Sequence, residues 1–338
     1  MSRTVSVRGS ISSAIYIARW VNSECNSTLV DLWCLFEFFQ AGFLGPLNEF
    51  AVNFKKPIEC KTEADEFAIK RLRQLIEPQI LRRLKSDVVK DLPLKLEDNH
   101  CRHLGISQYQ HKKYREAIEQ YEHNKKISQE MGAPAGTMIL GLLHKLKMIC
   151  AHPIEVTLEE SFFNASPKMD WLRSKLSEIK SKGEKAIVFS ELRDIQRDIK
   201  FMVSEQLGYL PKIINGDTNS NSEKGPSRQK LIDEFQAEPG FGVIILSTTA
   251  VGFGVNVQAA NHVIHFTRPW NPAKEDQATD RAYRIGQTKD VFVYYPTIVS
   301  TEYETFEKTL DSLLTRKRML AGDMLNGYDE IDLSQFDL

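Results

Sequence analysis

Between residues 185 and 295, short apolar stretches alternate with longer stretches of helical periodicity, and this alternation limits the possible folds more than any other feature. The apolar stretches are rich in β-branched and aromatic residues and lie at 186–189, 212–214, 243–246, 262–266 and 291–295. Helical patterns fill the intervals around 192–207, 228–235 and 272–283. Such alternation predicts an α/β fold, a parallel sheet with helices on both faces. Ligands of these sheets bind at the carboxyl ends of the strands.

The preceding region is mainly helical. One apolar helix face is predicted from residues spaced at i, i+3, i+4 and i+7: Leu29, Leu32, Trp33 and Phe36. Thr28 with Asp31 predicts the start of this helix, and Ser107 with Gln110 predicts the start of a second, because these pairs fit a capping box. A third helix runs towards Cys150. We therefore divide the chain into an irregular leader (1–27), a helical linker region (28–155), an α/β lobe (165–318) and an acidic tail (319–338).

The overall charge gives little sign of a nucleic-acid partner. Lys and Arg total 44 and Asp and Glu total 45, so the net charge is −1, although residues 70–95 are strongly basic. The five cysteines form no C-x-x-C pair, which favours free thiols in a reducing compartment. His and Cys residues between 100 and 152 lack paired ligand spacing, so no metal site is predicted. No apolar run approaches the ~18 residues of a membrane span, so no membrane association is expected.

The segment from Gln277 to Gln287 carries the most specific pattern. Asn271 and Pro272 predict that it begins as a helix. On that helix Gln277, Arg281 and Arg284 would share one face. Two guanidinium groups directed at one point can neutralise charge on a transferring phosphoryl group. The alternative is a surface helix whose arginines form salt bridges, with Asp280 as the nearest partner.

Three other segments follow predicted strands. The first contains Ser247 and Thr248 and a glycine-rich run to Asn256, and its glycines allow close approach of a phosphate. It matches neither G-x-x-x-x-G-K-[ST] nor G-x-G-x-x-G. The second is Ser190-Glu191, and the third is a turn around Gly216. Each of these segments alone is more often an ordinary connection between a strand and a helix than a binding site.

Taken in order, these segments resemble a known family. The stretches 185–191, 214–218, 246–256, 270–272 and 277–287 together resemble the second RecA-like lobe of Swi/Snf-type helicase-like ATPases, members of helicase superfamily two. The stretches 31–38 and 80–93 are similar to the region that joins the two lobes in that family, and 144–153 is similar to a further segment of the family. The resemblance implies a RecA-like parallel sheet preceded by a mainly helical linker region.

The resemblance also implies roles for individual residues. Arg281 and Arg284 would be arginine fingers that reach the γ-phosphate of ATP, with Gln277 supporting them. The residues implied at the ATP cleft are Gly252, Gly254, Asn256 and Asp280. The residues implied at double-stranded DNA are Ser190, Gly216, Ser247, Thr248 and Trp270, the last of which would also support the arginine helix. The cofactors would be ATP and Mg²⁺.

The sequence departs from the family pattern in two ways. Val251 stands where the family has a glycine, and neither a Walker A motif nor a D-E-x-H acid pair occurs in the chain. We therefore expect the C-terminal motor half of a DNA translocase or remodeller, inactive until a first RecA-like lobe joins it in cis or in trans. The alternatives are a non-catalytic DNA- or protein-binding module and a truncated gene fragment. DNA as partner predicts a bacterial cytoplasm, near the nucleoid, or a eukaryotic nucleus.

Overall fold

The computed structural model describes residues 29–60, 65–79, 93–130, 136–153, 165–218, 227–248, 256–284 and 286–325. These residues fall into two compact units. The smaller unit is drawn from the chain up to Lys90, from Asn271–Ala273 and from Leu314 onward. The larger unit comprises Asp91–Trp270 and Lys274–Leu313. Each unit has its own core, so each is described separately.

The smaller unit is helical. Its elements are α2 (Leu29–Phe39), α3 (Leu47–Phe50), the π-helix η1 (Ala51–Lys55), α4 (Lys56–Cys60), α5 (Asp65–Ile76) and the 3-10 helix η2 (Glu77–Gln79). Leu29 and Phe36 of α2 are buried in its core, and Leu32 and Trp33 pack against it, which confirms the predicted apolar face. The indole of Trp33 donates to the carbonyl of Gly45 at 2.9 Å, which ties the turn after α2 to that helix. The cap expected at Thr28 lies outside the described residues.

The larger unit is built on a six-stranded sheet in the order β1-β7-β6-β3-β5-β4. Every neighbouring pair is parallel. The strands are β1 (Lys95–Asp98), β3 (Lys185–Phe189), β4 (Lys212–Ile214), β5 (Gly242–Leu246), β6 (His262–His265) and β7 (Val291–Tyr294). All residues of β3, β5 and β6 are buried, including the polar Lys185, His262 and His265, as expected for central strands covered on both faces. The predicted parallel α/β fold is confirmed.

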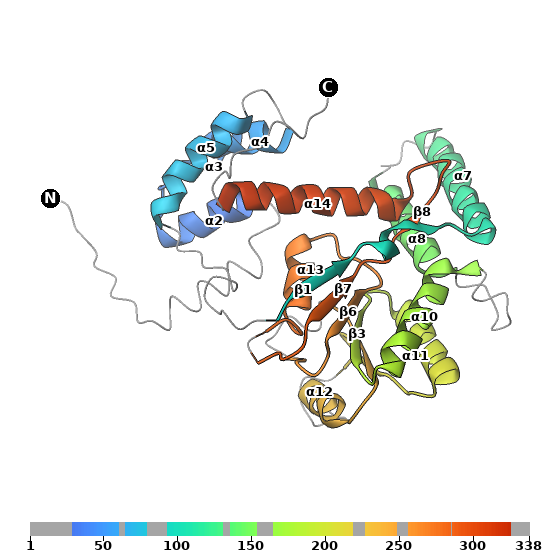
Figure 1. The fold of residues 1–338 in the computed structure, drawn as a ribbon. Helices are drawn as coiled ribbons and strands as arrows, with labels where there is room; N and C mark the ends of the chain where they lie inside the picture. The colour runs from blue at the N-terminus through green and yellow to red at the C-terminus, as the bar shows by residue number, and fades with distance from the viewer. Residues whose placement is uncertain are drawn as a thin grey trace, which may run out of the picture. The chain divides into compact units, whose positions relative to one another are not determined.

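Helices cover both faces of this sheet (Figure 1). On one face, α10 (Pro167–Ser181) and α11 (Arg193–Leu207) pack against alternate strand residues such as Val188 and Ile245. On the other, α12 (Arg228–Ala237) and α13 (Pro272–Thr279) pack against the intervening residues, including Ile187 and Ile244. Because successive strand side chains point to opposite faces, each strand contributes side chains to the hydrophobic cores on both faces of the sheet.

The edge strand β1 was not predicted. Its four residues, Lys-Leu-Glu-Asp, are mostly exposed, and they pair with β7 in the register Lys95↔Val291. The amide of Leu94 also donates to the carboxylate of Asp290 at 2.9 Å. The region that the sequence assigned to a helical linker therefore contributes a strand to the sheet. A polar edge strand lacks the apolar pattern by which the other strands were found.

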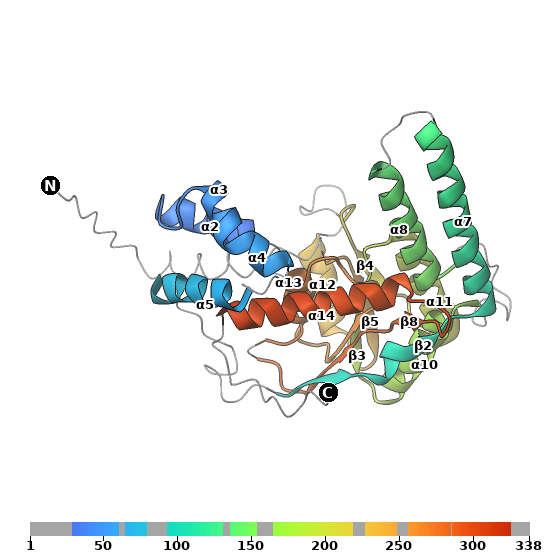
Figure 2. The ribbon, with the colours of Figure 1, turned by 90° about the horizontal axis from the view of Figure 1, so that it is seen from above.

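Two further helices follow a short connection. After the 3-10 helix η3 (His100–His103), β2 (Leu104–Gly105) pairs with β8 (Ile298–Val299). Then α7 (Gln108–Glu130) and α8 (Gly136–Ala151) lie side by side (Figure 2). The capping box at the start of α7 is confirmed, since the amide of Gln110 donates to the Ser107 hydroxyl at 3.1 Å and the amide of Ser107 donates back at 3.3 Å. The last helix is α14 (Phe306–Leu325).

Candidate functional site

Four strands end side by side, and the predicted site residues follow their last residues. The backbone pairing continues one step past the strands: Ser190 donates to Leu246, and Thr267 donates to Phe189. In the same way Ser247 donates to the carbonyl of Ile214 at 3.0 Å. The chain order of the strands reverses on either side of β3, which is the position where sheets of this kind bind ligands. The site therefore lies at the carboxyl edge of the larger unit.

Glu191, at the end of β3, organises this edge. Its carboxylate accepts hydrogen bonds from the Ser247 hydroxyl at 3.0 Å and from the backbone amide of Thr248 at 2.7 Å. The Thr248 hydroxyl donates to the same carboxylate. The Glu191 amide in turn donates to the Thr267 hydroxyl at 3.0 Å, so one residue joins the ends of β3, β5 and β6. The predicted DNA-binding hydroxyls of β5 are thus directed at a carboxylate of the same chain.

The other two predicted DNA contacts differ in exposure. Ser190 is fully buried, and its hydroxyl accepts from the amide of Leu192 at 3.3 Å, just before α11 begins. Gly216 is exposed in the turn after β4. That turn is held by the Asn215 side chain, which accepts from the Asp217 amide at 3.0 Å, as in an Asx turn. Gly216 can therefore be approached from outside, whereas Ser190 is covered and shapes the turn between β3 and α11.

The segment with the arginines begins as predicted and ends earlier. The Asn271 side chain accepts from the Ala273 amide at 2.9 Å, which confirms the cap that places Pro272 first in α13. The helix stops at Thr279, so the prediction that Gln277, Arg281 and Arg284 share one helix face is wrong. The half-buried Gln277 belongs to α13, whereas Asp280 and both arginines lie on the turns that follow.

Bonds to distant segments explain why the helix stops. The Arg281 carbonyl, which a continuing helix would use, accepts instead from the amide of Val257 at 3.0 Å. The Arg284 guanidinium donates to the side chain of Asn256. The buried side-chain amide of Gln287 donates to the backbone carbonyls of Gln258 at 2.9 Å, Ala260 at 3.0 Å and Ala282 at 3.3 Å. The arginine turn is therefore fastened along its length to residues 256–260.

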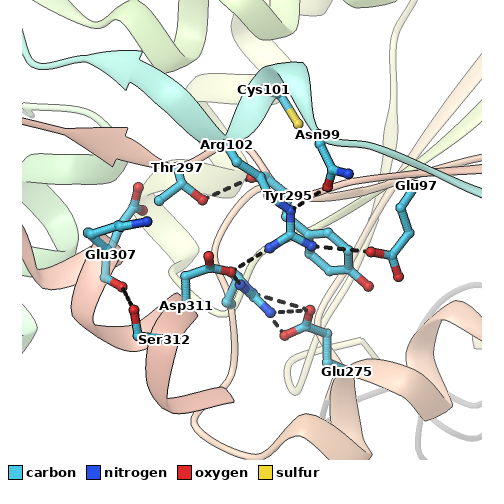
Figure 3. Close-up of polar contacts among 12 residues, drawn as sticks. Glu97, Asn99, Cys101, Arg102, Glu275, Tyr295, Thr297, Glu307, Asp311 and Ser312 are labelled. Carbon is cyan, nitrogen blue, oxygen red and sulfur yellow. Dashed lines mark hydrogen bonds and ion pairs between the residues drawn. The ribbon is translucent and has the colours of Figure 1, made fainter. Parts of the chain in front are cut away.

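A group of buried and half-buried charges holds α13 against the sheet (Figure 3). Arg268, which follows β6, pairs with Glu275 of α13 at 3.0 Å. Asp311 of α14 pairs with Arg268 and also with Arg102, the latter at 2.6 Å. Both guanidinium groups lie over the ring of Tyr295, 4.6 and 4.7 Å from its centre. The mutual pairing of these charges offsets the cost of burying them and fixes the helix that leads to the arginine turn.

A lysine and an aromatic residue complete the support of this edge. Lys147 of α8 is buried and donates to the carbonyl of Arg268 at 2.9 Å. Burial lowers the pKa of Lys147, because water no longer stabilises its charge. Trp270 is half exposed, and its ring meets that of Phe306 edge-on at 5.4 Å. Trp270 thus packs on the first residue of α14, just ahead of α13.

Two predicted cleft residues, Gly252 and Gly254, lie outside the described residues, as does Val251. Within the described ranges, no group of three or more His, Cys, Asp or Glu side chains is arranged to hold a metal ion. In that same part of the chain, no helix is long and apolar enough to cross a membrane.

Three residues that shape the site were not predicted from the sequence. They are Glu191, Glu275 and Gln287, the last of which fastens the arginine turn. Glu191 and Gln287 stand inside motifs that were singled out, but their partners lie 56 and 29 residues away. Glu275 reads as an ordinary polar position of a surface helix, yet it is fully buried. Only the buried neighbours of these side chains reveal their roles.

The sequence matches two described domain families. Residues 24–155 match the SNF2-related domain, and residues 167–286 match the helicase conserved C-terminal domain. The second match ends at Gly286, so it contains the strand ends and the arginine turn described above.

Individual proteins agree with these matches. The Zorya protein ZorD of Escherichia coli is 55% identical over 312 residues, which are 92% of this chain and 29% of that protein. The putative ATP-dependent helicase/translocase YwqA of Bacillus subtilis is 34% identical over 90% of this chain and 32% of its own length. The chain thus spans about 30% of these relatives.

A solved structure shows the same fold. The Sulfolobus solfataricus SWI2/SNF2 ATPase core in complex with double-stranded DNA superimposes with a TM-score of 0.52 at 33% identity. It covers 88% of this chain, which corresponds to 61% of the solved chain. Together with the two domain matches and the RecA-like sheet, these similarities lead to one conclusion: the chain belongs to the Swi/Snf-type family of helicase-like ATPases.

Proposed function

We propose that this chain is the C-terminal motor half of an ATP-dependent translocase or remodeller of double-stranded DNA. The observation that supports this most directly is the fastening of the arginine turn to residues 256–260 at the carboxyl edge of the sheet. A turn held from both sides presents guanidinium groups in a fixed place, which is what stabilisation of a phosphoryl-transfer transition state requires.

The two arginines differ in how far they are available to a nucleotide. Arg284 is half-buried and reaches the side chain of Asn256, whereas Arg281 is only 7% exposed. In our proposal Arg284 leads the approach to the γ-phosphate and Arg281 joins it when a first lobe closes over the edge. Gln277 and Asp280 flank this turn and support it, as the family resemblance implies.

The residues present suit the phosphates of ATP better than its metal. Guanidinium and amide groups are good donors to phosphate oxygens. Mg²⁺ prefers carboxylates and water, and the described residues offer no such cluster. ATP, when bound, would supply the phosphoryl group whose hydrolysis drives movement. We therefore propose that a first RecA-like lobe, in cis or in trans, holds Mg²⁺ and most of the nucleotide.

Double-stranded DNA is the partner proposed for the same edge. The relative of known structure was solved with double-stranded DNA, as its name states. Here Gly216, Ser247 and Thr248 follow neighbouring strands, so they would lie near successive phosphates, with Trp270 at the margin. Contacts of this kind position a protein on the duplex without reading its sequence.

The test is ATP hydrolysis by the purified chain supplied with a separately expressed first RecA-like lobe of a family member, with and without duplex DNA. We expect hydrolysis that DNA stimulates and that Arg284→Ala and Arg281→Ala each reduce by about 10³-fold, the scale of an arginine finger. Arg197→Ala on α11 serves as the control, because that arginine is 73% exposed and pairs with Asp194 in its own helix turn.

Two results would contradict the proposal in different ways. If Arg281→Ala and Arg284→Ala hydrolyse ATP as fast as Arg197→Ala, the arginines are not fingers. If the first lobe never produces DNA-stimulated hydrolysis while the chain alone binds duplex DNA, the non-catalytic binding module is the better description.

A further inference from the structure

The carboxylate of Glu191 lies where several hydrogen-bond donors converge, as they do in an anion-binding site. Three donors converge on it from the end of β5: the Ser247 hydroxyl, the Thr248 amide and the Thr248 hydroxyl. The side chains that carry the hydroxyls are nearly covered, at 5% and 7% exposure. A backbone amide and two hydroxyls are the groups that proteins also use to bind phosphate oxygens.

The same donors cannot serve Glu191 and a phosphate at once. A hydroxyl group has a single proton to donate, and a backbone amide likewise has one. In the structure all three are directed at Glu191. A second anion at this place would also meet the negative charge of the carboxylate at close range. Ser247 and Thr248 can therefore donate to DNA only after the Glu191 side chain has moved away.

The backbone at Glu191 is held independently of its side chain. Its amide donates to the Thr267 hydroxyl at 3.0 Å, and that hydroxyl donates to Ser190 at 3.1 Å. Rotation of the Glu191 side chain would leave both bonds in place. The strand end therefore keeps its shape when the carboxylate leaves the donors of Ser247 and Thr248.

We propose that Glu191 is an internal competitor of the DNA backbone, which occupies the donors of Ser247 and Thr248 until a phosphate displaces it. This inference rests on the proposed function, because it takes duplex DNA as the ligand of this edge. Glu191 would weaken DNA binding at rest and would couple the capture of a phosphate to a change at the end of β3. It would set the affinity for the DNA backbone and would not be a catalytic residue.

The test is the affinity of the full chain for a short fluorescein-labelled DNA duplex, measured by fluorescence anisotropy at one fixed salt concentration. Glu191→Gln keeps the shape and an acceptor oxygen but removes the charge. We expect this variant to bind about tenfold more tightly, the difference between a charge-assisted and a neutral hydrogen bond. In a Ser247→Ala/Thr248→Ala background the same change should gain less than about twofold, because the hydroxyl donors are gone.

Glu178→Gln is the matched control for loss of one negative charge. Glu178 is an exposed, lysine-paired residue near the end of α10, which leads into the amino end of β3, at the opposite edge of the sheet. If Glu191→Gln binds no more tightly than Glu178→Gln while the wild type binds duplex DNA, Glu191 only positions Thr248 and the inference is wrong. If none of these proteins binds duplex DNA, the proposed DNA-binding function fails and the inference fails with it.

Discussion

The pairing of Arg268 with Glu275 sets a measurable share of the stability of the larger unit. Glu275 is 0% exposed and Arg268 is 5% exposed. The Arg268 Nε lies 3.2 and 3.0 Å from the two carboxylate oxygens, and a terminal nitrogen lies 3.0 Å from one of them. Glu275→Gln leaves a buried guanidinium with Asp311 as its remaining carboxylate partner in this network. Such a change costs about 3 kcal/mol, at the lower end for a broken buried pair.

For a unit of this size, about 3 kcal/mol corresponds to a fall in Tm of about 6–12 °C. Thermal unfolding followed by far-UV circular dichroism at pH 7 measures it. Arg268→Met/Glu275→Leu should recover most of the loss, because apolar side chains of similar volume need no charged partner. Glu234→Gln, on the exposed face of α12, should leave Tm unchanged. A Glu275→Gln variant as stable as Glu234→Gln would refute the assignment of this pair as a stabilising clamp.

Three further predictions concern single side chains. Gln287→Glu removes the side-chain NH2 group that three carbonyls share and should destabilise the protein by about 2–4 kcal/mol, with faster hydrogen exchange confined first to the arginine turn. Burial lowers the pKa of His152 from 6.5 to about 4, so stability present above pH 6.5 is lost as pH falls towards 4, by about 1.4 kcal/mol per pH unit. Urea titrations between those values should show this slope reduced in His152→Gln. Burial and the nearby charge of Asp194 raise the pKa of Asp198 from 3.8 to about 6. The pH dependence of stability is therefore opposite to that of His152, because stability is lost as pH rises from about 4 to 6. Asp198→Asn should therefore raise Tm at pH 7 and not at pH 4.

The sheet could be predicted because its central strands are buried on both faces. A run such as Lys185–Phe189, apolar after its first residue, has few alternatives to a central parallel strand. The strand β1 escaped for the opposite reason, since its exposed Lys-Leu-Glu-Asp sequence becomes a strand only by pairing with β7. Local pattern predicts burial well, but it carries no signal for an element that is defined by its neighbour.

The candidate site also combines features that the local sequence predicts with features that depend on tertiary contacts. The residue types at the strand ends and the cap at Asn271 follow from local chemistry, and the structure places them as expected. The end of α13 at Thr279 does not follow from local chemistry, because it depends on the hydrogen bond from the amide of Val257 to the carbonyl of Arg281. The role of Glu191 likewise depends on β5 lying beside β3. Tertiary hydrogen bonds override helical periodicity wherever they offer the backbone a different partner.

The position of β1 also has a consequence for how this protein reaches its native state. The bond from Leu94 to Asp290 closes a separation of 196 residues, so the β1–β7 pairing is among the most non-local in the larger unit. Contacts of that kind form late, because loop-closure entropy opposes them until the rest of the sheet exists. Until then β7, with the sequence Val-Phe-Val-Tyr, offers an open edge to any other extended chain. That edge is open to association with other chains during folding, and pairing with the short, polar strand β1 closes it.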